Sequence, residues 1–297
     1  GKFMPSYDYF TVDVFTQRRF GGNPLAVFPT AEGIDDATMQ ALAAELNYSE
    51  TTFVLPPANS VSTARVRIFN RTSEMPFAGH PNVGTAFVLA RHGFVRGAML
   101  RFEELAGMVE VRVMEADGVI LGAEIDAPLP LTILEDLPVQ DIAACLSLAT
   151  DEIVIAEHPP IRATTGVDFV LVGVTPHGVA QAFPDLKAYR MLERQWPSFG
   201  GRLSILLYSV EAHNVRARMF APLAGTWEDP ATGSANATLA ALRLHLSGDE
   251  RLSYEAVQGV EMGRESRLSV RSWRTPDGVR ASVGGMCASV FRGRIEL

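Results

Sequence analysis

Two stretches of the chain combine residue types that could bind and activate an anionic small molecule. They are His80-Pro81-Asn82-Val83-Gly84-Thr85-Ala86 and Asp229-Pro230-Ala231-Thr232-Gly233-Ser234-Ala235, and both run polar, proline, two free positions, glycine, hydroxyl, alanine. A polar residue followed by proline predicts a helix N-cap and first helical position. Helix starts bind anions through free N–H groups and the positive end of the dipole. We therefore expect a small anionic metabolite to contact the glycine and hydroxyl residues, Gly84, Thr85, Gly233 and Ser234.

Glu50 is the candidate proton carrier. It lies in Asn47-Tyr48-Ser49-Glu50-Thr51, where a predicted helix gives way to a β-branched, apolar stretch that predicts a strand. A carboxyl group in a partly apolar cleft is desolvated, which raises its pKa and suits it to general acid–base catalysis near neutral pH. The alternative is a solvated glutamate in a helix–strand connection.

His80 and Asp229 are the candidate partners of Glu50 in catalysis. The neutral-range pKa of histidine suits it to proton transfer or hydrogen bonding. Structural roles are the alternative, since His80 could be a capping or core histidine and Asp-Pro is a common helix entry. The repetition favours a shared cleft, because the two equivalent positions carry one basic and one acidic side chain.

Other kinds of site find little support in the sequence. There is neither a GxxxxGK[ST] motif nor a GxGxxG that follows a strand, which argues against a nucleotide site. No two of the six histidines are spaced i, i+4, so we expect no metal. The G-x-S-x-G motif of serine hydrolases is absent, which argues against that class of enzyme.

Composition narrows the class of protein. The 297 residues carry a net charge of −8 and contain no basic run, which argues against nucleic acid as a partner. No apolar stretch reaches the roughly 18 residues that a membrane span needs, and the first residues do not read as a secretory signal. Cys145 and Cys287 are expected to be free thiols in a reducing cytoplasm. We therefore expect a cytoplasmic protein with no membrane partner.

The elements that must position these residues follow from the hydrophobic pattern. Residues 10–14 and 51–55 predict strands, and residues 109–125 predict a hairpin around Asp117-Gly118. The helix after His80 is apolar on nearly every side, which predicts that other structure surrounds it. Strands around one buried helix indicate a barrel-like sheet. Pro128-Leu129-Pro130 marks the best domain boundary, after which the second half repeats the theme.

At these residues the chain resembles the PhzF family of phenazine-biosynthesis isomerases, which share the fold of diaminopimelate epimerase. The matching stretches lie in the same order along nearly the whole chain. They are 13–28, Asn47-Tyr48-Ser49-Glu50-Thr51, Met75-Pro76-Phe77-Ala78-Gly79-His80-Pro81, Glu228-Asp229-Pro230-Ala231-Thr232-Gly233-Ser234-Ala235, Gln258-Gly259, Gly263-Arg264 and Gly293-Arg294.

The resemblance implies an α+β fold of two similar domains, each a barrel-like, mostly antiparallel sheet around a central helix, with the active site in the cleft between them. We expect the N-terminal domain to comprise residues 1–127 with about 287–297, and the C-terminal domain residues 128–286. The resemblance also implies a homodimer that works without cofactor or metal.

The resemblance assigns roles to the candidate residues. In the family, the glutamate that matches Glu50 moves a proton between carbons of a cyclic diene amino acid. The residues that match His80, Asp229 and Ser234 bind and orient that substrate, and glycines at the helix starts, including Gly79, hold its carboxylate. Racemases of this architecture use two cysteines, one at each helix start. In this chain the corresponding neighbourhoods hold Gly79-His80 and Asp229-Pro230 and no cysteine. Two-thiol stereoinversion is therefore disfavoured.

The resulting hypothesis is a PhzF-like isomerase that shifts a proton within a small carboxylated, unsaturated or cyclic metabolite, similar to trans-2,3-dihydro-3-hydroxyanthranilate. Two alternatives remain. One is a metabolite-binding or interaction protein on the same fold without catalysis, and the other is a cysteine-independent epimerase. The variable positions Asn82 and Trp227 leave the exact substrate open.

Overall fold

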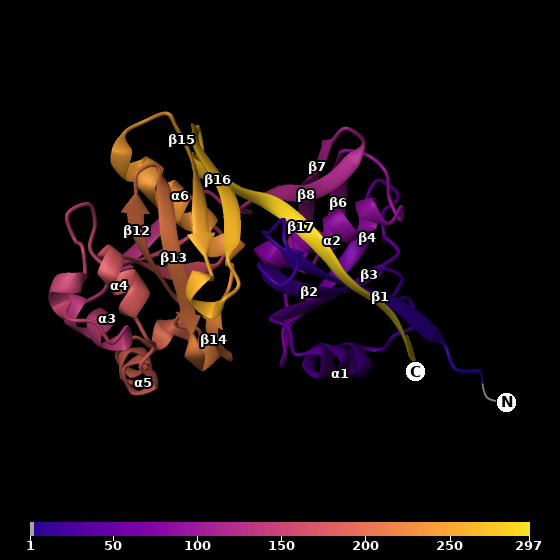
Figure 1. Ribbon diagram of the computed structural model, residues 1–297, viewed down its shortest axis with the longest axis horizontal. Helices are drawn as coiled ribbons and strands as arrows, with labels where there is room; N and C mark the ends of the chain where they lie inside the picture. The colour runs from indigo at the N-terminus through magenta and orange to yellow at the C-terminus, as the bar shows by residue number, and fades with distance from the viewer. Residues whose placement is uncertain (1–2) are drawn as a thin grey trace. The chain divides into compact units, whose positions relative to one another are not determined.

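The computed structural model describes residues 3–297. Their strands and helices belong to two compact units. Unit 1 runs from the N-terminus to Asp126 and resumes at Gly284–Leu297, and unit 2 is Ala127–Val283. The last strand, β17 (Gly278–Glu296), has residues in both units (Figure 1).

The strands of unit 1 close into a barrel. Neighbours pair in the order β17–β1–β2–β3–β4–β6–β7–β8, and β8 pairs with β17 again. The pairs β2–β3 and β4–β6 are parallel. The elements are β1 (Ser6–Val14), β2 (Asn23–Phe28), α1 (Asp36–Leu46), β3 (Glu50–Leu55), β4 (Ala64–Phe69), β5 (Glu74–Met75), α2 (Gly79–Arg91), β6 (Met99–Glu104), β7 (Gly107–Ala116) and β8 (Val119–Asp126).

Helix α2 occupies the interior of this barrel. Every residue from Gly79 to Leu89 is buried, and the helix contacts β1, β2, β3, β7 and β8. The prediction of a helix surrounded by other structure is confirmed for α2. Burying apolar side chains on all sides of the helix removes them from water, which is the main force that stabilises this arrangement.

Helix α1 covers the outside of the same barrel. Its N-cap Asp35 accepts a hydrogen bond from the Thr38 N–H at 2.8 Å, and Asn47 ends it in the left-handed conformation. Met39 packs with Phe28 and Phe53 in a buried cluster. Strands β2 and β3 are therefore covered on both faces, which explains why consecutive residues of each strand are buried, including Thr51 and Thr52 of β3.

Unit 2 repeats the pairing pattern of unit 1. Its strands pair β9–β10–β11–β12–β13–β15–β16–β17, with β11–β12 and β13–β15 parallel, and α6 contacts β10, β11, β15 and β16. The elements are β9 (Thr132–Asp136), α3 (Val139–Cys145), η1 (Thr150–Glu152), β10 (Ile161–Thr164), β11 (Asp168–Gly173), α4 (Pro176–Gln181), α5 (Leu186–Gln195), η2 (Pro197–Phe199), β12 (Ile205–Glu211), β13 (Asn214–Ala221), η3 (Pro222–Ala224), β14 (Thr226–Asp229), α6 (Gly233–Ser247), β15 (Arg251–Gln258), η4 (Val260–Met262) and β16 (Ser266–Thr275).

Helices α3, α4 and α5 of unit 2 were not predicted from the sequence. They lie on the opposite side of β12 from α6 (Figure 1). Tyr189 of α5 is fully buried in a cluster with Leu207 and Phe220, and its hydroxyl donates to the Phe220 carbonyl at 3.2 Å. The helices are short, and only α5 shows a clear amphipathic pattern, so the sequence signal was weak.

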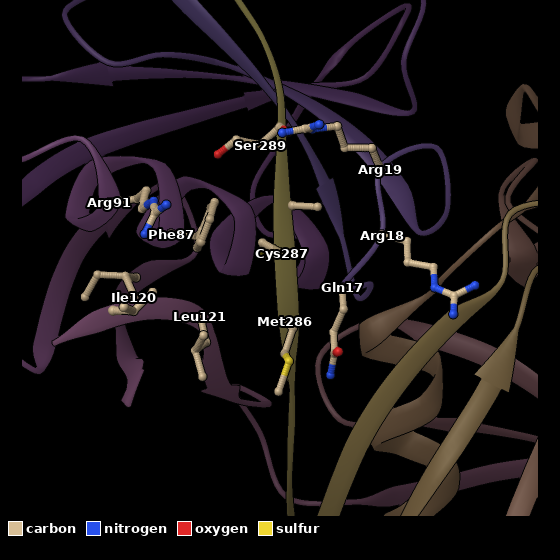
Figure 2. A pocket seen from close by; sticks show the side chains of 12 residues that line it. Gln17, Arg18, Arg19, Phe87, Arg91, Ile120, Leu121, Met286, Cys287 and Ser289 are labelled. Carbon is tan, nitrogen blue, oxygen red and sulfur yellow. The ribbon is translucent and has the colours of Figure 1, made fainter. Parts of the chain in front are cut away.

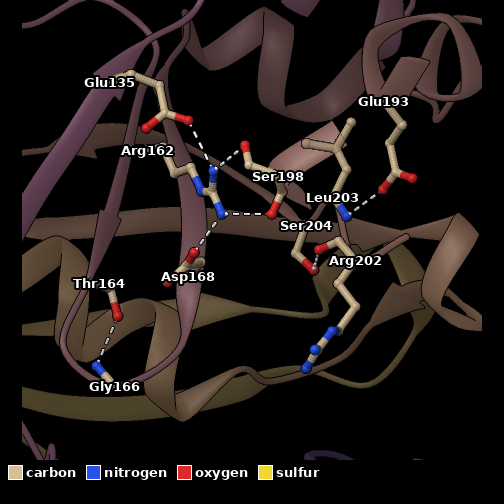
Figure 3. A network of polar contacts seen from close by, with 10 residues as sticks. All are labelled: Glu135, Arg162, Thr164, Gly166, Asp168, Glu193, Ser198, Arg202, Leu203 and Ser204. Carbon is tan, nitrogen blue, oxygen red and sulfur yellow. Dashed lines mark hydrogen bonds and ion pairs between the residues drawn. The ribbon is translucent and has the colours of Figure 1, made fainter. Parts of the chain in front are cut away.

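One buried arginine ties the strands of unit 2 together. Arg162 of β10 is 8% exposed, and its guanidinium donates to Glu135 of β9 at 2.9 Å and to Asp168 of β11 at 2.6 Å. It also donates to the hydroxyl and carbonyl of Ser198 (Figure 3). The planar fork of arginine suits this arrangement, because its donors can serve several acceptors at once.

The close packing of α2 against the barrel gives a first prediction. A Cβ at Gly84 would lie 2.5 Å from Leu25 Cδ2 and 2.7 Å from Val14 Cγ2. We expect Gly84→Ala to lower the free energy of unfolding by about 1–3 kcal/mol, despite the higher helix propensity of alanine. Urea unfolding measures it. Gly178→Ala is the control, because there the nearest atom is the Thr175 hydroxyl at 3.2 Å; an equal effect in both variants would contradict the packing argument.

Among residues 3–297, none of the helices has the length and apolar character that crossing a membrane requires.

Candidate active site

Glu50 and His80 lie side by side in unit 1. Glu50 is the first residue of β3, and His80 is the second residue of α2. The His80 Nδ1 atom is 3.4 Å from Glu50 Oε2, and the two side chains are 5% and 14% exposed. The expectation for Glu50 was a carboxyl group held partly away from water, and this is where the structure places it.

Burial keeps the His80 ring neutral. Desolvation lowers the pKa of His80 to about 3, against the opposing effect of a hydrogen bond to the backbone of Pro24. Because proline has no N–H, the ring must donate to the Pro24 carbonyl. The Nε2 atom is buried without a hydrogen-bond partner. The ring proton is therefore assigned to Nδ1, which leaves Nε2 as an acceptor.

The shifted pKa of His80 predicts a loss of stability in acid. Between the unfolded value of 6.5 and the folded value of about 3, the unfolded chain binds the additional proton, so stability falls as pH falls through this window. Relative to His80→Gln, the protein should lose up to about 3 kcal/mol between pH 7 and pH 4. Urea unfolding at both pH values tests this, with His213→Gln at an exposed position as the control. Equal losses in the protein and in His80→Gln would show that His80 is not responsible.

The helix starts differ from the sequence prediction. His80 and Asp229 were expected to be N-caps, but α2 is capped by Ala78 and α6 by Thr232. That prediction is wrong because Pro230 lies in the connection before α6 and not in its first turn. Proline's fixed φ suits such a connection as well as a helix start. His80 is inside the first turn of α2.

The other predicted residues of unit 1 lie along α2. Gly79 is its buried first residue. Gly84 lies one turn further in, packed against Val14 and Leu25, where its N–H is within the helical ladder. The Thr85 hydroxyl is fully buried and lies 2.7 Å from the Thr52 hydroxyl of β3. Gly79 is therefore the one of the three that lies at the helix start, whereas Gly84 and Thr85 pack inside the barrel.

The predicted residues of unit 2 surround the start of α6. Asp229 ends β14, is 7% exposed, and accepts a hydrogen bond from the Thr232 hydroxyl at 2.6 Å. Gly233 and Ser234 are the first two residues of α6, and Ser234 is more accessible than its neighbours. Their N–H groups belong to the first turn, which has no intrahelical acceptors. This turn has the donors that an anion requires.

Sequence reasoning missed a network that is repeated at both helix starts. The fourth residues of α2 and α6 are Asn82 and Asn236, each of which donates to the carbonyl of its N-cap residue, at 3.0 and 2.9 Å. Each also donates to the last residue of a barrel strand, Glu104 of β6 at 3.1 Å and Gln258 of β15 at 2.9 Å. The repeated G-x-x-N spacing was the available signal. In structural register, Gly79 therefore corresponds to Gly233.

The two cysteines are poorly suited to acid–base chemistry. Cys145 is in the core of unit 2 and Cys287 is buried on β17. Burial raises the pKa of Cys145 to about 12 and shifts that of Cys287 upward as well. Two-thiol chemistry is disfavoured on this ground too. Within residues 3–297, no group of three or more His, Cys, Asp or Glu side chains is arranged to hold a metal ion.

A hollow of about 750 Å³ lies elsewhere in unit 1. Figure 2 shows Phe87 of α2 facing β17 near Cys287, with Arg91 on one side and Ile120 and Met286 below. Neither Glu50 nor His80 lines this hollow. It adjoins the second half of α2, whereas the candidate residues lie at its start.

Comparison with known proteins identifies the family. The profile of the phenazine biosynthesis-like proteins, PhzC-PhzF, matches residues 12–293. The chain belongs to this family. It is 37% identical to an uncharacterized isomerase of Mesorhizobium japonicum, over 98% of the chain and 99% of that protein. It is 33% identical to a trans-2,3-dihydro-3-hydroxyanthranilate isomerase of Pseudomonas aeruginosa, over 97% and 99%. With relatives of this kind, the chain is an isomerase of the PhzF family.

A solved structure confirms the α+β fold. The Bacillus anthracis phenazine biosynthesis protein of the PhzF family superimposes with a TM-score of 0.88 at 22% identity, covering 99% of this chain and 100% of that one. At this identity the likeness establishes the fold of this chain.

Proposed function

We propose that the protein isomerises a small carboxylated, unsaturated or cyclic metabolite similar to trans-2,3-dihydro-3-hydroxyanthranilate, with Glu50 as the proton carrier. The observation that carries this proposal is the Glu50 carboxyl beside a neutral, buried His80, 3.4 Å away. The named activity of the Pseudomonas aeruginosa relative supports the substrate class.

The proposed step moves one proton within the substrate. Glu50 removes a proton from an activated C–H bond, and the bonding electrons join the conjugated system of the substrate. The double bond shifts, and Glu50 returns the proton to a different carbon, so that atoms and charge balance. A carboxyl group that is mostly excluded from water suits this task, because little solvation has to be lost as its charge changes.

The remaining candidate residues would bind and orient the substrate. His80 Nε2, an unpartnered buried acceptor, suits a substrate amine or hydroxyl. The first turns of α2 and α6 supply N–H groups for a carboxylate, from Gly79 in one unit and from Gly233 and Ser234 in the other. We propose Asp229 as a further polar contact of the substrate. Orienting the reacting carbons near Glu50 would account for much of the rate.

The test is conversion of trans-2,3-dihydro-3-hydroxyanthranilate in deuterated water, followed by NMR. We expect an isomer of equal mass apart from partial deuterium incorporation at one carbon, because a carboxyl group that is mostly shielded from water exchanges only part of its protons with solvent during turnover. Glu45→Gln, at an exposed position on α1, is a matched control that should keep full activity.

Two results would contradict the proposal. Binding of the compound without conversion or deuterium incorporation favours a metabolite-binding protein. A change in optical rotation with the double bonds unmoved favours an epimerase.

A further inference from the structure

The two helix starts are braced by equivalent side chains of different chemistry. Glu104 ends β6 and Gln258 ends β15, and both follow buried inward-facing residues at alternate positions of the strand. Each accepts a hydrogen bond from the fourth residue of the enclosed helix, Asn82 or Asn236. The two positions are therefore equivalent in the repeated topology, but one holds an acid and the other an amide.

Gln258 uses both ends of its amide. Its Oε1 accepts from the Thr232 N–H at 3.1 Å and from Asn236, and its Nε2 donates to the Asp229 carbonyl at 2.8 Å and to the Thr232 hydroxyl at 3.1 Å. The donor end thus ties β14, which carries Asp229, to the start of α6. An ionised carboxylate has no donor and could not replace it.

When Glu104 is ionised, its second carboxylate oxygen, which corresponds to the donor end of the Gln258 amide, has no hydrogen-bond partner. Its Oε1 accepts from Asn82 Nδ2, but its Oε2 is buried without a hydrogen-bond partner, and so is Asn82 Oδ1. Two buried acceptors without donors are costly. A protonated Glu104 supplies one O–H donor to this pair of groups, so that acid and amide can bond reciprocally.

We infer that Glu104 is held in its neutral form and braces the first turn of α2 as Gln258 braces that of α6. Glu104 is thus a positioning residue for the turn that contains His80. Its environment agrees with this assignment. Burial raises the pKa of Glu104 to about 8, and the opposing hydrogen bond from Asn82 is the smaller effect. The neighbouring Glu103 faces away from Glu104 and accepts hydrogen bonds from the N–H groups of Ala58 and Asn59. His80, two residues before Asn82, is itself neutral.

The test compares unfolding equilibria of the full chain and of Glu104→Gln by urea titration between pH 5 and pH 9. A carboxyl group with a raised folded pKa makes the folded state bind the additional proton between pH 4.5 and about 8, so stability falls as pH rises through this window. The unfolding constant of the protein, divided by that of Glu104→Gln, should rise by about a hundredfold or more from pH 5 to pH 8.5.

Glu103→Gln is the matched control, one residue away on the same strand. Hydrogen bonds from backbone N–H groups lower the pKa of Glu103, so this ratio should not rise with pH. A flat ratio for Glu104→Gln, or one that behaves like that of Glu103→Gln, would show that Glu104 is ionised in the folded protein and would overturn the inference.

The reciprocal change tests the equivalence directly. Gln258→Glu should be destabilised more at pH 8.5 than at pH 5, because only a protonated acid can replace the amide donor. Unfolding that is no more pH-dependent than that of the unchanged protein would contradict the inference.

A kinetic readout separates positioning of His80 from structural support. Glu104→Gln should keep kcat within about twofold, whereas Glu104→Leu should lower it about tenfold or more at saturating substrate. Equal kcat in both variants would contradict a positioning role. This readout rests on the proposed isomerase activity, whereas the pH dependence of unfolding does not, so the two can fail separately.

Discussion

Replacing Glu50 by glutamine is expected to lower kcat by about 10³-fold while leaving the fold intact. Glutamine keeps the size of the side chain but cannot take up or release a proton near neutral pH, and general acid–base catalysis typically contributes about 10²–10⁴-fold. The Glu50 side chain is 14% exposed and lies 3.4 Å from His80 Nδ1, so an amide fits the same space. Steady-state kinetics with trans-2,3-dihydro-3-hydroxyanthranilate measures the effect.

The comparison variants make this result specific. Glu45→Gln removes an exposed carboxyl group five residues away and should change kcat by less than about twofold. Substrate binding to Glu50→Gln should survive, because the carboxylate contacts proposed for the helix starts remain. Full turnover by Glu50→Gln would rule out Glu50 as the proton carrier, whatever the substrate.

Removing Arg218 is expected to have the largest effect on stability. Arg218 of β13 and Glu228 of β14 form a buried pair at 2.8 Å, with side chains 8% and 9% exposed. Arg218 also donates to the carbonyls of Val179 and Ala182, both at 2.9 Å. Arg218→Met leaves Glu228 buried without its cation, which should lower the free energy of unfolding by about 3–5 kcal/mol. Glu228 directly precedes Asp229, so the pair also fixes the strand end that carries a candidate site residue.

An exposed ion pair of the same unit gives the control for Arg218. Arg267 pairs with Glu255 at 2.7 Å, but these side chains are 56% and 35% exposed. Arg267→Met should change the free energy of unfolding by less than about 1 kcal/mol in urea titrations. Similar losses in the two variants would mean that burial does not determine the contribution of the Arg218–Glu228 pair.

Local patterns were sufficient to predict much of the barrel. The turn at Asp117-Gly118 joins β7 to β8 as expected, with both residues at positive φ. The all-round apolar character of α2 predicted its burial, because nothing else explains a helix without a polar face. The junction between α1 and β3, from Asn47 to Glu50, was also predictable, because helix periodicity ends there and β-branched residues begin.

The helix starts could not be placed from the same patterns. A proline after a polar residue predicts a cap, but the structure uses Pro230 in a connection and Pro81 inside the first turn of α2. The bracing pairs were beyond local reasoning as well. Asn82 and Glu104 are 22 residues apart, and their contact arises only when α2 is enclosed by β6 and the other strands.

The proximity of Glu50 and His80 is likewise a product of packing. His80 was a candidate by residue type, and the resemblance assigned it to the site. Its low pKa, however, comes from desolvation inside the barrel, which no sequence pattern shows.

Following an isotopic label through one turnover tests the role of Glu50 most directly. The substrate carries deuterium at the carbon that loses its proton, and the product is analysed by NMR after a single turnover in ordinary water. Transfer by a carboxyl group mostly shielded from water predicts that part of the label appears at the newly protonated carbon of the product, and that Glu50→Gln abolishes the transfer. Label that remains on its original carbon while the product forms would contradict the assignment.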